Sequence, residues 1–132
     1  MATVISFEAL EERDLNARLA KQKAREGSGS SIRCAHCGQP VSSADQRIDQ
    51  GGAHEHLFEN PAGIVFRIGC FRRAPGCRSA GEATLAWTWF PGYPWALALC
   101  TKCASHLGWF YGPGPAGDAF YALILDRLNE SM

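Results

Sequence analysis

Apolar positions in the second half of the chain recur at the short intervals typical of strands. An apolar run over 64–68 suits a buried strand, a second run covers 95–99, and aromatic residues alternate with others over 85–90. Glycine and proline separate these runs, as expected of turns between short strands. The tail over 120–128 predicts a strand that continues into a short helical turn. The pattern indicates a small, mainly antiparallel β domain with many loops.

The first quarter of the chain has a different pattern. Residues 4–26 carry an imperfect apolar stripe among charges, which predicts a helical arm that is either docked on the domain or solvated. Residues 27–31 contain only glycine and serine, a composition typical of a flexible linker. We therefore assign 1–31 to a helical or flexible arm with its linker, and 32–132 to the compact domain.

Composition and charge narrow the functional classes. A length of 132 residues fits one domain. The 13 Lys and Arg residues balance the 13 Asp and Glu residues, so the chain lacks the basic surplus of nucleic-acid binders and any attraction to anionic membranes. No apolar stretch is long enough to span a bilayer, and the N-terminus lacks the apolar core of a signal peptide. We expect a cytoplasmic monomer with neither nucleic acid nor membrane as partner.

Four cysteines form two C-x-x-C pairs, Cys34 with Cys37 and Cys100 with Cys103. This spacing lets a tight turn present two thiolates to one tetrahedral ion, and Gly38 allows the backbone to approach closely. Four thiolates saturate zinc, so we expect a structural Zn²⁺ that does no chemistry. A redox pair or two disulfides are the alternatives, and two pairs at matching spacing fit them less well.

Two further cysteines, Cys70 and Cys77, lie outside these pairs. Cys70 follows an apolar run, which predicts burial, and Cys77 lies in a predicted loop. A disulfide between them would be unusual in the cytoplasm. The metal pairs themselves are separated by about 62 residues, so the metal would close a long loop and stabilise the fold strongly.

Aromatic residues are concentrated in one segment. Three tryptophans and two other aromatics fall within 87–95, and Trp109 follows the second cysteine pair. A hydrophobic core is the ordinary use of such residues, but four tryptophans exceed what a small core needs, and several lie beside turns. They predict a pocket that holds either a cation over ring faces or a flat neutral ring. Their spacing does not choose between these two.

Several motifs occur in a specific order over about 32–128. They are C-x-x-C, His54-Glu55-His56, Asn60-Pro61-Ala62-Gly63, the segment Trp89 to Trp95, and C-x-x-C-A-S-H-L-G-W ending at Trp109. This series closely resembles the CULT domain family, the thalidomide-binding domain of cereblon, which also exists as a stand-alone bacterial protein. The resemblance implies a β-tent fold, in which two antiparallel sheets are pinned together by zinc.

The resemblance also implies a ligand site and its function. Trp89, Trp95 and Trp109 would wall a cage for a cyclic imide such as a glutarimide. Tyr111 would line the cage, Asn60 and Pro61 would cover one side, and the backbone around Trp87 and Trp89 would accept from the imide N–H and donate to a carbonyl. The expected function is a non-catalytic small-molecule or degron-binding module. Thalidomide-type ligands, uridine-like metabolites and cyclic-imide protein C-termini are the expected ligands.

One position departs from the family pattern. The family histidine whose side chain reaches the ligand is replaced here by Trp87, which we do not expect to be a cage wall. We expect His54 and His56 to order strands by hydrogen bonding, and His106 to support Trp109.

Two other functions compete with this hypothesis. A methionine sulfoxide reductase B-like enzyme would use Cys70 or Cys77 as its nucleophile, but neither lies within the aromatic segments. A reader of methylammonium groups usually adds a carboxylate to its aromatic cage, and the tryptophan segments contain none. A pI near 6.9 argues against a polynucleotide ligand.

Overall fold

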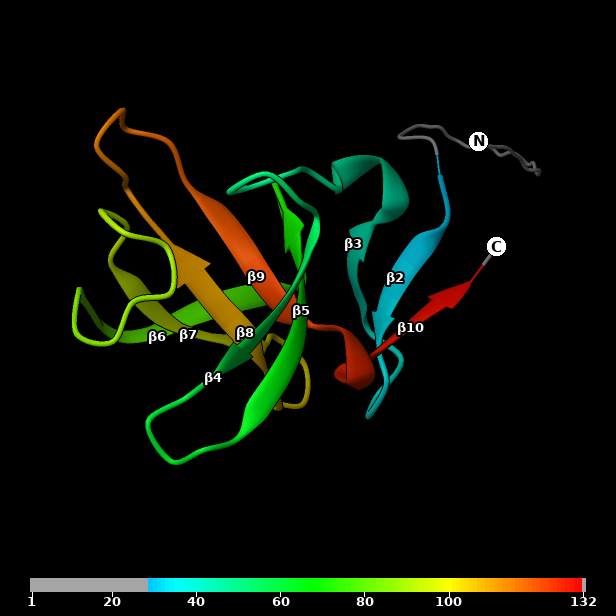
Figure 1. The fold of residues 1–132 in the computed structure, drawn as a ribbon. Helices are drawn as coiled ribbons and strands as arrows, with labels where there is room; N and C mark the ends of the chain where they lie inside the picture. Colours follow the sequence, from blue (N-terminus) through cyan, green and yellow to red (C-terminus); the bar gives the residue numbers. More distant parts are fainter. Residues whose placement is uncertain (1–28, 132) are drawn as a thin grey trace.

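The computed structural model describes residues 29–131, and this part of the chain is mostly β (Figure 1). The helical arm expected over 4–26 lies outside the described residues. The elements, in chain order, are β2 Ser31–Cys34, β3 Pro40–Ser43, the 3₁₀ turn η1 Ala44–Gln46, β4 Glu55–Glu59, β5 Val65–Phe71, β6 Cys77–Thr84, β7 Trp95–Cys100, β8 His106–Tyr111, β9 Phe120–Ile124, the 3₁₀ turn η2 Leu125–Arg127 and β10 Leu128–Ser131.

The strands form two antiparallel sheets. The larger sheet has the order β4-β5-β9-β8-β7-β6, and the smaller one has the order β10-β2-β3 (Figure 1). The last strand returns the chain to its beginning, because β10 pairs with β2 and places Leu128 opposite Cys34. The arrangement confirms the prediction of a mainly β fold made of two antiparallel sheets.

Two of the predicted strands are found where the sequence placed them, and one is less buried than expected. The run over 95–99 is β7, and the tail forms β9 followed by the turn η2. The run over 64–68 belongs to β5, but Ile64 and Val65 are 53% and 60% exposed. They lie at the end of the β4–β5 hairpin, and burial begins only at Ile68.

The strand expected over 85–90 is wrong, because this segment forms turns. The Thr84 hydroxyl accepts a hydrogen bond from the Ala86 N–H at 3.1 Å, and the Thr88 N–H bonds to the Leu85 carbonyl at 3.2 Å. Trp87 between them has φ +60°, which is incompatible with a strand. The real strand before it is β6, an exposed edge strand of small and polar residues that gave no apolar signal.

Strand β9 shows how the larger sheet divides the core. Successive side chains of a strand point to opposite faces. Leu123 packs in a cluster shared with the smaller sheet, together with Ile32 and Val41. Ala122 and Ile124 pack on the other side, beneath the aromatic loop. The first cluster contains Cys34 and Cys100 of the two C-x-x-C pairs. The second contains Trp109 and Tyr111 of the predicted ligand site. Both predicted sites therefore pack against the larger sheet.

Candidate functional site: a four-thiol cluster and an indole-lined pocket

Each cysteine pair is presented by a turn of the same construction. In the first, the Gly38 N–H bonds to the Cys34 carbonyl at 2.8 Å. In the second, the Ala104 N–H bonds to the Cys100 carbonyl at 2.9 Å. The residue after the second cysteine has a positive φ in both turns, +80° for Gly38 and +64° for Ala104. The turns therefore present their thiols in the same way.

From the sequence we expected glycine at position 38 to permit a close backbone approach, and this expectation is wrong. A Cβ built on Gly38 meets no atom within 4 Å, so no close backbone approach requires glycine there. The positive φ is the constraint, and glycine adopts it without the steric cost that Ala104 bears.

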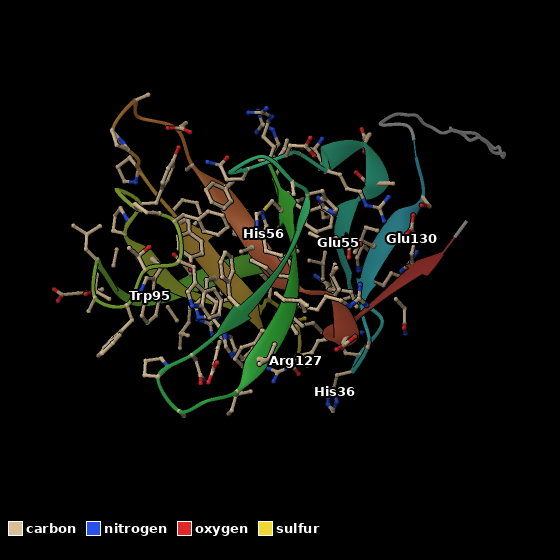
Figure 2. All side chains as sticks on the ribbon, in the orientation of Figure 1. His36, Glu55, His56, Trp95, Arg127 and Glu130 are labelled. Atoms are coloured by element: carbon tan, nitrogen blue, oxygen red, sulfur yellow. The ribbon has the colours of Figure 1, made fainter. Side chains whose placement is uncertain are left out.

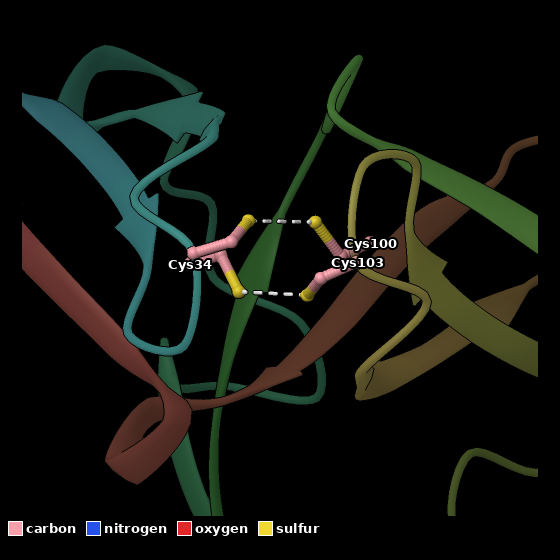
Figure 3. A group of neighbouring side chains, drawn as sticks. Cys34, Cys100 and Cys103 are labelled. Carbon is pink, nitrogen blue, oxygen red and sulfur yellow. Dashed lines mark hydrogen bonds between the residues drawn. The ribbon is translucent and has the colours of Figure 1, made fainter.

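The four thiols converge from the two sheets on one point (Figure 3). The Sγ atoms of Cys34 and Cys103 are 3.7 Å apart, those of Cys37 and Cys100 are 3.6 Å apart, and all four lie within 4.8 Å of one another. Zn–S bonds of about 2.3 Å in a tetrahedron place sulfurs about 3.8 Å apart. The cluster therefore has the dimensions of a tetrahedral metal site, with Cys34 from the end of β2 and Cys100 from the end of β7.

All six cysteines of the described residues are free, so the disulfide alternatives are not observed. Cys70 and Cys77 are buried, and burial raises the pKa of each thiol to about 12. A thiol with so high a pKa is a poor nucleophile at neutral pH.

An apolar pocket of about 390 Å³ lies on the aromatic side of the larger sheet. Its lining residues come from the β4–β5 hairpin, the aromatic loop over 85–94 and strands β7 and β8. They are Asn60, Pro61, Phe66, Trp87, Trp89, Trp95, His106, Trp109 and Tyr111. The structure thus brings together all seven residues that the sequence assigned to the ligand site.

Backbone contacts fix the orientation of two of the tryptophans. The Trp89 indole N–H donates to the Glu59 carbonyl at 3.2 Å, and the Trp95 indole N–H donates to the Ala86 carbonyl at 2.7 Å. Trp89 also meets Trp109 edge to face, with ring centroids 4.9 Å apart. Figure 2 shows Trp95 among the aromatic side chains at one end of the larger sheet. Contacts within the protein therefore hold these two indoles in fixed orientations.

Sheet register places Trp95 beside Tyr111. Trp95 begins β7, and its Cα partner on β8 is Tyr111, so the two side chains leave the same face of the sheet. Trp109, two residues earlier on β8, shares this face with Tyr111. Tyr111 is only 2% exposed, whereas Trp87 at the rim is 74% exposed.

Asn60 and Pro61 line the pocket from the turn of the β4–β5 hairpin. The Asn60 side-chain oxygen accepts hydrogen bonds from the Ala62 and Ile64 N–H groups, at 3.0 and 2.9 Å. This oxygen therefore shapes the hairpin turn, and Pro61 next to it is exposed at the pocket edge. Asn60 therefore lines the pocket with a side chain whose oxygen already accepts two hydrogen bonds from the backbone.

Sequence reasoning missed two lining residues. Phe66 faces inward on β5, where its ring meets Trp109 edge to face at 5.3 Å. Its alternation with Ile68 and Cys70 along one strand was the available signal. His106 was expected to support Trp109, and its ring does lie 5.0 Å from that indole, but it also lines the pocket.

Three of the four histidines lie within hydrogen-bond distance of backbone carbonyls. His54 Nδ1 lies 3.1 Å from the Ile48 carbonyl, and His56 Nε2 lies 2.8 Å from that of Gln50, so both order strand β4 and the turn before it. His106 Nε2 lies 2.8 Å from the Gly108 carbonyl, and burial lowers the pKa of this imidazole. His36, in the first cysteine turn, is exposed and points away from the cluster (Figure 2).

The chain is similar in sequence to cereblon. It is 36% identical to cereblon from Danio rerio over 52 residues, which are 39% of this chain and 12% of that one. It is 29% identical to cereblon from Drosophila erecta over 98 residues, which are 72% of this chain and 17% of that one. The matches thus span only a small part of the relatives' length. No family model matches the chain.

The fold is similar to that of a crystal structure of a Mis18 Yippee-like domain. The TM-score is 0.54 at 15% identity, covering 78% of this chain and 95% of that one. At this identity the likeness concerns the fold alone. Within the described residues, no helix is long and apolar enough to cross a membrane. The order of the motifs and the cereblon matches together confirm the resemblance of this chain to the CULT domain that cereblon carries.

Proposed function

We propose that the chain is a non-catalytic binding module that holds a flat cyclic imide in the indole-lined pocket. Its ligand is a glutarimide or a thalidomide-type compound, a uridine-like metabolite, or a cyclic imide at a protein C-terminus. The composition of the pocket wall carries this proposal: four indoles, a phenyl ring, a phenol and an imidazole line it, and no carboxylate, lysine or arginine is among its lining residues. A pocket of 300–1,000 Å³ with apolar walls and few polar groups is typical of small-molecule sites.

The wall chemistry favours a neutral ligand over a cation. A methylammonium group gains from ring faces, but it would be desolvated here without a carboxylate partner. The guanidinium of Arg127 lies 5.9 Å from the Phe66 ring and adds positive charge near this wall. A flat imide instead offers apolar ring carbons to the indole faces and a polar edge to backbone groups.

The aromatic loop supplies the polar groups for that edge. The backbone around Trp87 and Trp89 passes the pocket in turns rather than in a strand, so its N–H and C=O groups are not all used by a ladder. We propose that this backbone accepts a hydrogen bond from the imide N–H and donates one to an imide carbonyl. Each such hydrogen bond in a dry pocket contributes about 1 kcal/mol net.

We propose zinc as the metal of the four-thiol cluster, with a structural role. Four thiolates leave no open coordination position, and the sulfur spacing suits a tetrahedral d¹⁰ ion. Metal analysis of purified protein should find one zinc per chain, and none after all four cysteines are replaced.

The structure offers little support for the alternative enzyme. A sulfoxide reductase needs an activated thiol in its pocket, but Cys70 and Cys77 are not among the lining residues and their pKa is raised. We further propose that the module works as a monomer in the cytoplasm, without nucleic-acid or membrane partners.

A calorimetric titration with glutarimide, followed in parallel by tryptophan fluorescence, tests the proposed function. The wild-type protein should bind, and Trp95→Ala or Trp109→Ala should weaken binding at least about thirtyfold, as expected for aromatic residues central to a binding site. Leu57→Ala is the control, because Leu57 is 70% exposed and lies outside the pocket. Absence of wild-type binding, or equal binding by the tryptophan variants, would contradict the proposal.

A further inference from the structure

Ser105 lies beside the four-thiol cluster, directly after the second cysteine turn. Its Oγ atom is 3.1 Å from the Sγ atom of Cys103, within hydrogen-bond distance for sulfur, and both residues are half-buried. Figure 3 shows the Cys103 sulfur turned toward the other cysteines of the cluster, and it lies 3.7 Å from that of Cys34. The Ser105 hydroxyl therefore borders the cluster without taking the place of one of its four ligands.

The backbone fixes the position of Ser105. Its carbonyl accepts a hydrogen bond from the Cys100 N–H at 2.9 Å, and the N–H of the preceding Ala104 bonds to the Cys100 carbonyl at 2.9 Å. These bonds close the turn that joins β7 to β8, and the next residue, His106, begins β8. Only χ1 and the hydroxyl rotation remain to be set, so little freedom is lost when the hydroxyl meets the sulfur.

The direction of this hydrogen bond depends on the state of the sulfur. A free Cys103 thiol donates its proton to the Ser105 oxygen. A metal-bound cysteine is a thiolate, which has no proton and can only accept. A serine hydroxyl suits both states, because it donates or accepts according to its rotation.

The position of Cys103 in the cluster makes a donor valuable there. Four thiolates around one divalent ion carry a net negative charge, which hydrogen-bond donors around the ligands stabilise. Cys34 and Cys100 are buried, whereas Cys37 and Cys103 are partly exposed. Cys103 is therefore one of the two sulfurs that a proton or a chelator reaches from solvent. A hydrogen bond draws electron density from this sulfur and makes it a poorer target.

We propose that the Ser105 hydroxyl donates a hydrogen bond to the metal-bound Cys103 thiolate and thereby helps to retain the metal. This inference rests on the metal proposed above, and it makes Ser105 a positioning residue of that site rather than a ligand.

The first cysteine turn uses the corresponding position differently. Gln39, like Ser105, comes two residues after the second cysteine of its pair. Its side-chain N–H donates to the Thr101 hydroxyl oxygen at 2.8 Å and so joins the two turns to each other. The Gln39 side chain therefore supports the geometry of the cluster through a neighbouring turn, whereas Ser105 contacts a sulfur directly.

The test uses the full chain loaded with Co²⁺ in place of zinc, because the absorption band for charge transfer from thiolate to metal reports on the sulfur itself. A hydrogen bond lowers the energy of the sulfur lone pairs, so its loss in Ser105→Ala should move this band to longer wavelength. Ser105→Thr keeps the hydroxyl and should keep the wild-type band. Competition with EDTA should show zinc bound about tenfold to a hundredfold more weakly by Ser105→Ala.

Gln39→Ala is the matched control. It removes a side-chain hydrogen bond of the same cluster that does not end on a sulfur. Its charge-transfer band should stay at the wild-type wavelength, whatever its metal affinity.

The outcomes separate this inference from the proposed metal site. If the wild-type protein binds neither Co²⁺ nor Zn²⁺, the metal site fails and the inference fails with it. If the metal binds but Ser105→Ala has the wild-type band and affinity, the inference alone is overturned. A weaker affinity with an unmoved band also overturns it, because the hydroxyl would then only support the turn. Ser105→Thr with a band shifted to longer wavelength, or an equal shift in Gln39→Ala, would likewise contradict it.

Discussion

At the residue scale, the pocket depends on how its indoles use their N–H groups. Trp89 and Trp95 both donate to backbone carbonyls, of Glu59 and Ala86, on the hairpin and loop that border the pocket. A buried indole N–H needs a partner, and these two already have one. Their contribution to a ligand is therefore the ring face, which favours a flat apolar surface over a hydrogen-bond acceptor.

His106 gives a pH-dependent prediction at this scale. Burial lowers the pKa of its imidazole below 6.5, so the folded protein binds a proton less readily than the unfolded chain. Its effect on stability is absent above the unfolded pKa, and as the pH falls through 6.5 this residue destabilises the fold. An NMR titration of the imidazole should give a pKa below 6.5. A value above 6.5 would contradict the buried position beside Trp109.

Cys70 gives a second prediction, which bears on catalysis. Cys70→Ala should lower the free energy of unfolding by about 1–2 kcal/mol, because it removes a fully buried side chain. Glutarimide affinity should not change, since Cys70 does not line the pocket. Denaturant unfolding and calorimetry measure the two effects. Thiol-dependent reduction of methionine sulfoxide by the wild type, lost in Cys70→Ser, would instead revive the enzyme.

At the residue scale, the sequence predicted those site residues that belong to short motifs. Two C-x-x-C pairs predicted the thiol cluster, because spacing alone fixes how a turn presents two cysteines. The tryptophans predicted a pocket because there are four of them in a small domain and several lie beside predicted turns. Phe66 was missed because its place on the pocket wall depends on β5 pairing with β4 and on the loop that covers both strands. The positions of such residues are set by contacts distant in sequence.

At the element scale, the least predictable parts were β6 and the loop that follows it. β6 is an edge strand with mostly exposed side chains, so hydrophobic alternation could not reveal it. The loop over 85–94 contains strand-like aromatics, but Thr84 and Thr88 hydrogen-bond its backbone into turns. Aromatic alternation over 85–90 therefore reflected a pocket wall rather than a strand.

The approach of β8 to β9 gives a prediction for one glycine. A Cβ on Gly108 would lie 2.1 Å from the Ala122 carbonyl oxygen, so these strands can pack only with glycine there. Gly108→Ala should lower the unfolding free energy by more than about 3 kcal/mol or prevent folding. Gly81→Ala is the control, because φ is +83° there but the space around it is open, and it should cost about 1 kcal/mol.

Thermal unfolding followed by circular dichroism compares the two glycine variants. Equal midpoints for Gly108→Ala and Gly81→Ala would show that the β8–β9 contact is not as close as described.

At the scale of the whole molecule, the thiol cluster joins the two sheets. Cys34 ends β2 of the smaller sheet and Cys37 lies in the turn after it, while Cys100 ends β7 of the larger sheet and Cys103 lies in the turn between β7 and β8. These two strands also carry Trp95 and Trp109. A metal bound here would therefore fix the pocket walls as well as the sheets.

Metal removal should abolish fold and binding together. Structural zinc binds with about 10–16 kcal/mol, which is comparable to the whole stability of a domain, about 5–15 kcal/mol. A strong chelator, or Cys100→Ser, should eliminate the cooperative unfolding transition and the glutarimide response. A zinc-free Cys100→Ser protein that still bound glutarimide would refute the link between cluster and pocket.

The central claim is that a cyclic imide binds between the indoles. A crystal structure of the protein grown with glutarimide tests it most directly. The account predicts one ligand ring enclosed by Trp89, Trp95 and Trp109, with its imide edge against the backbone around Trp87 and Trp89. An empty pocket at saturating glutarimide, or a ring bound elsewhere on the molecule, would contradict it.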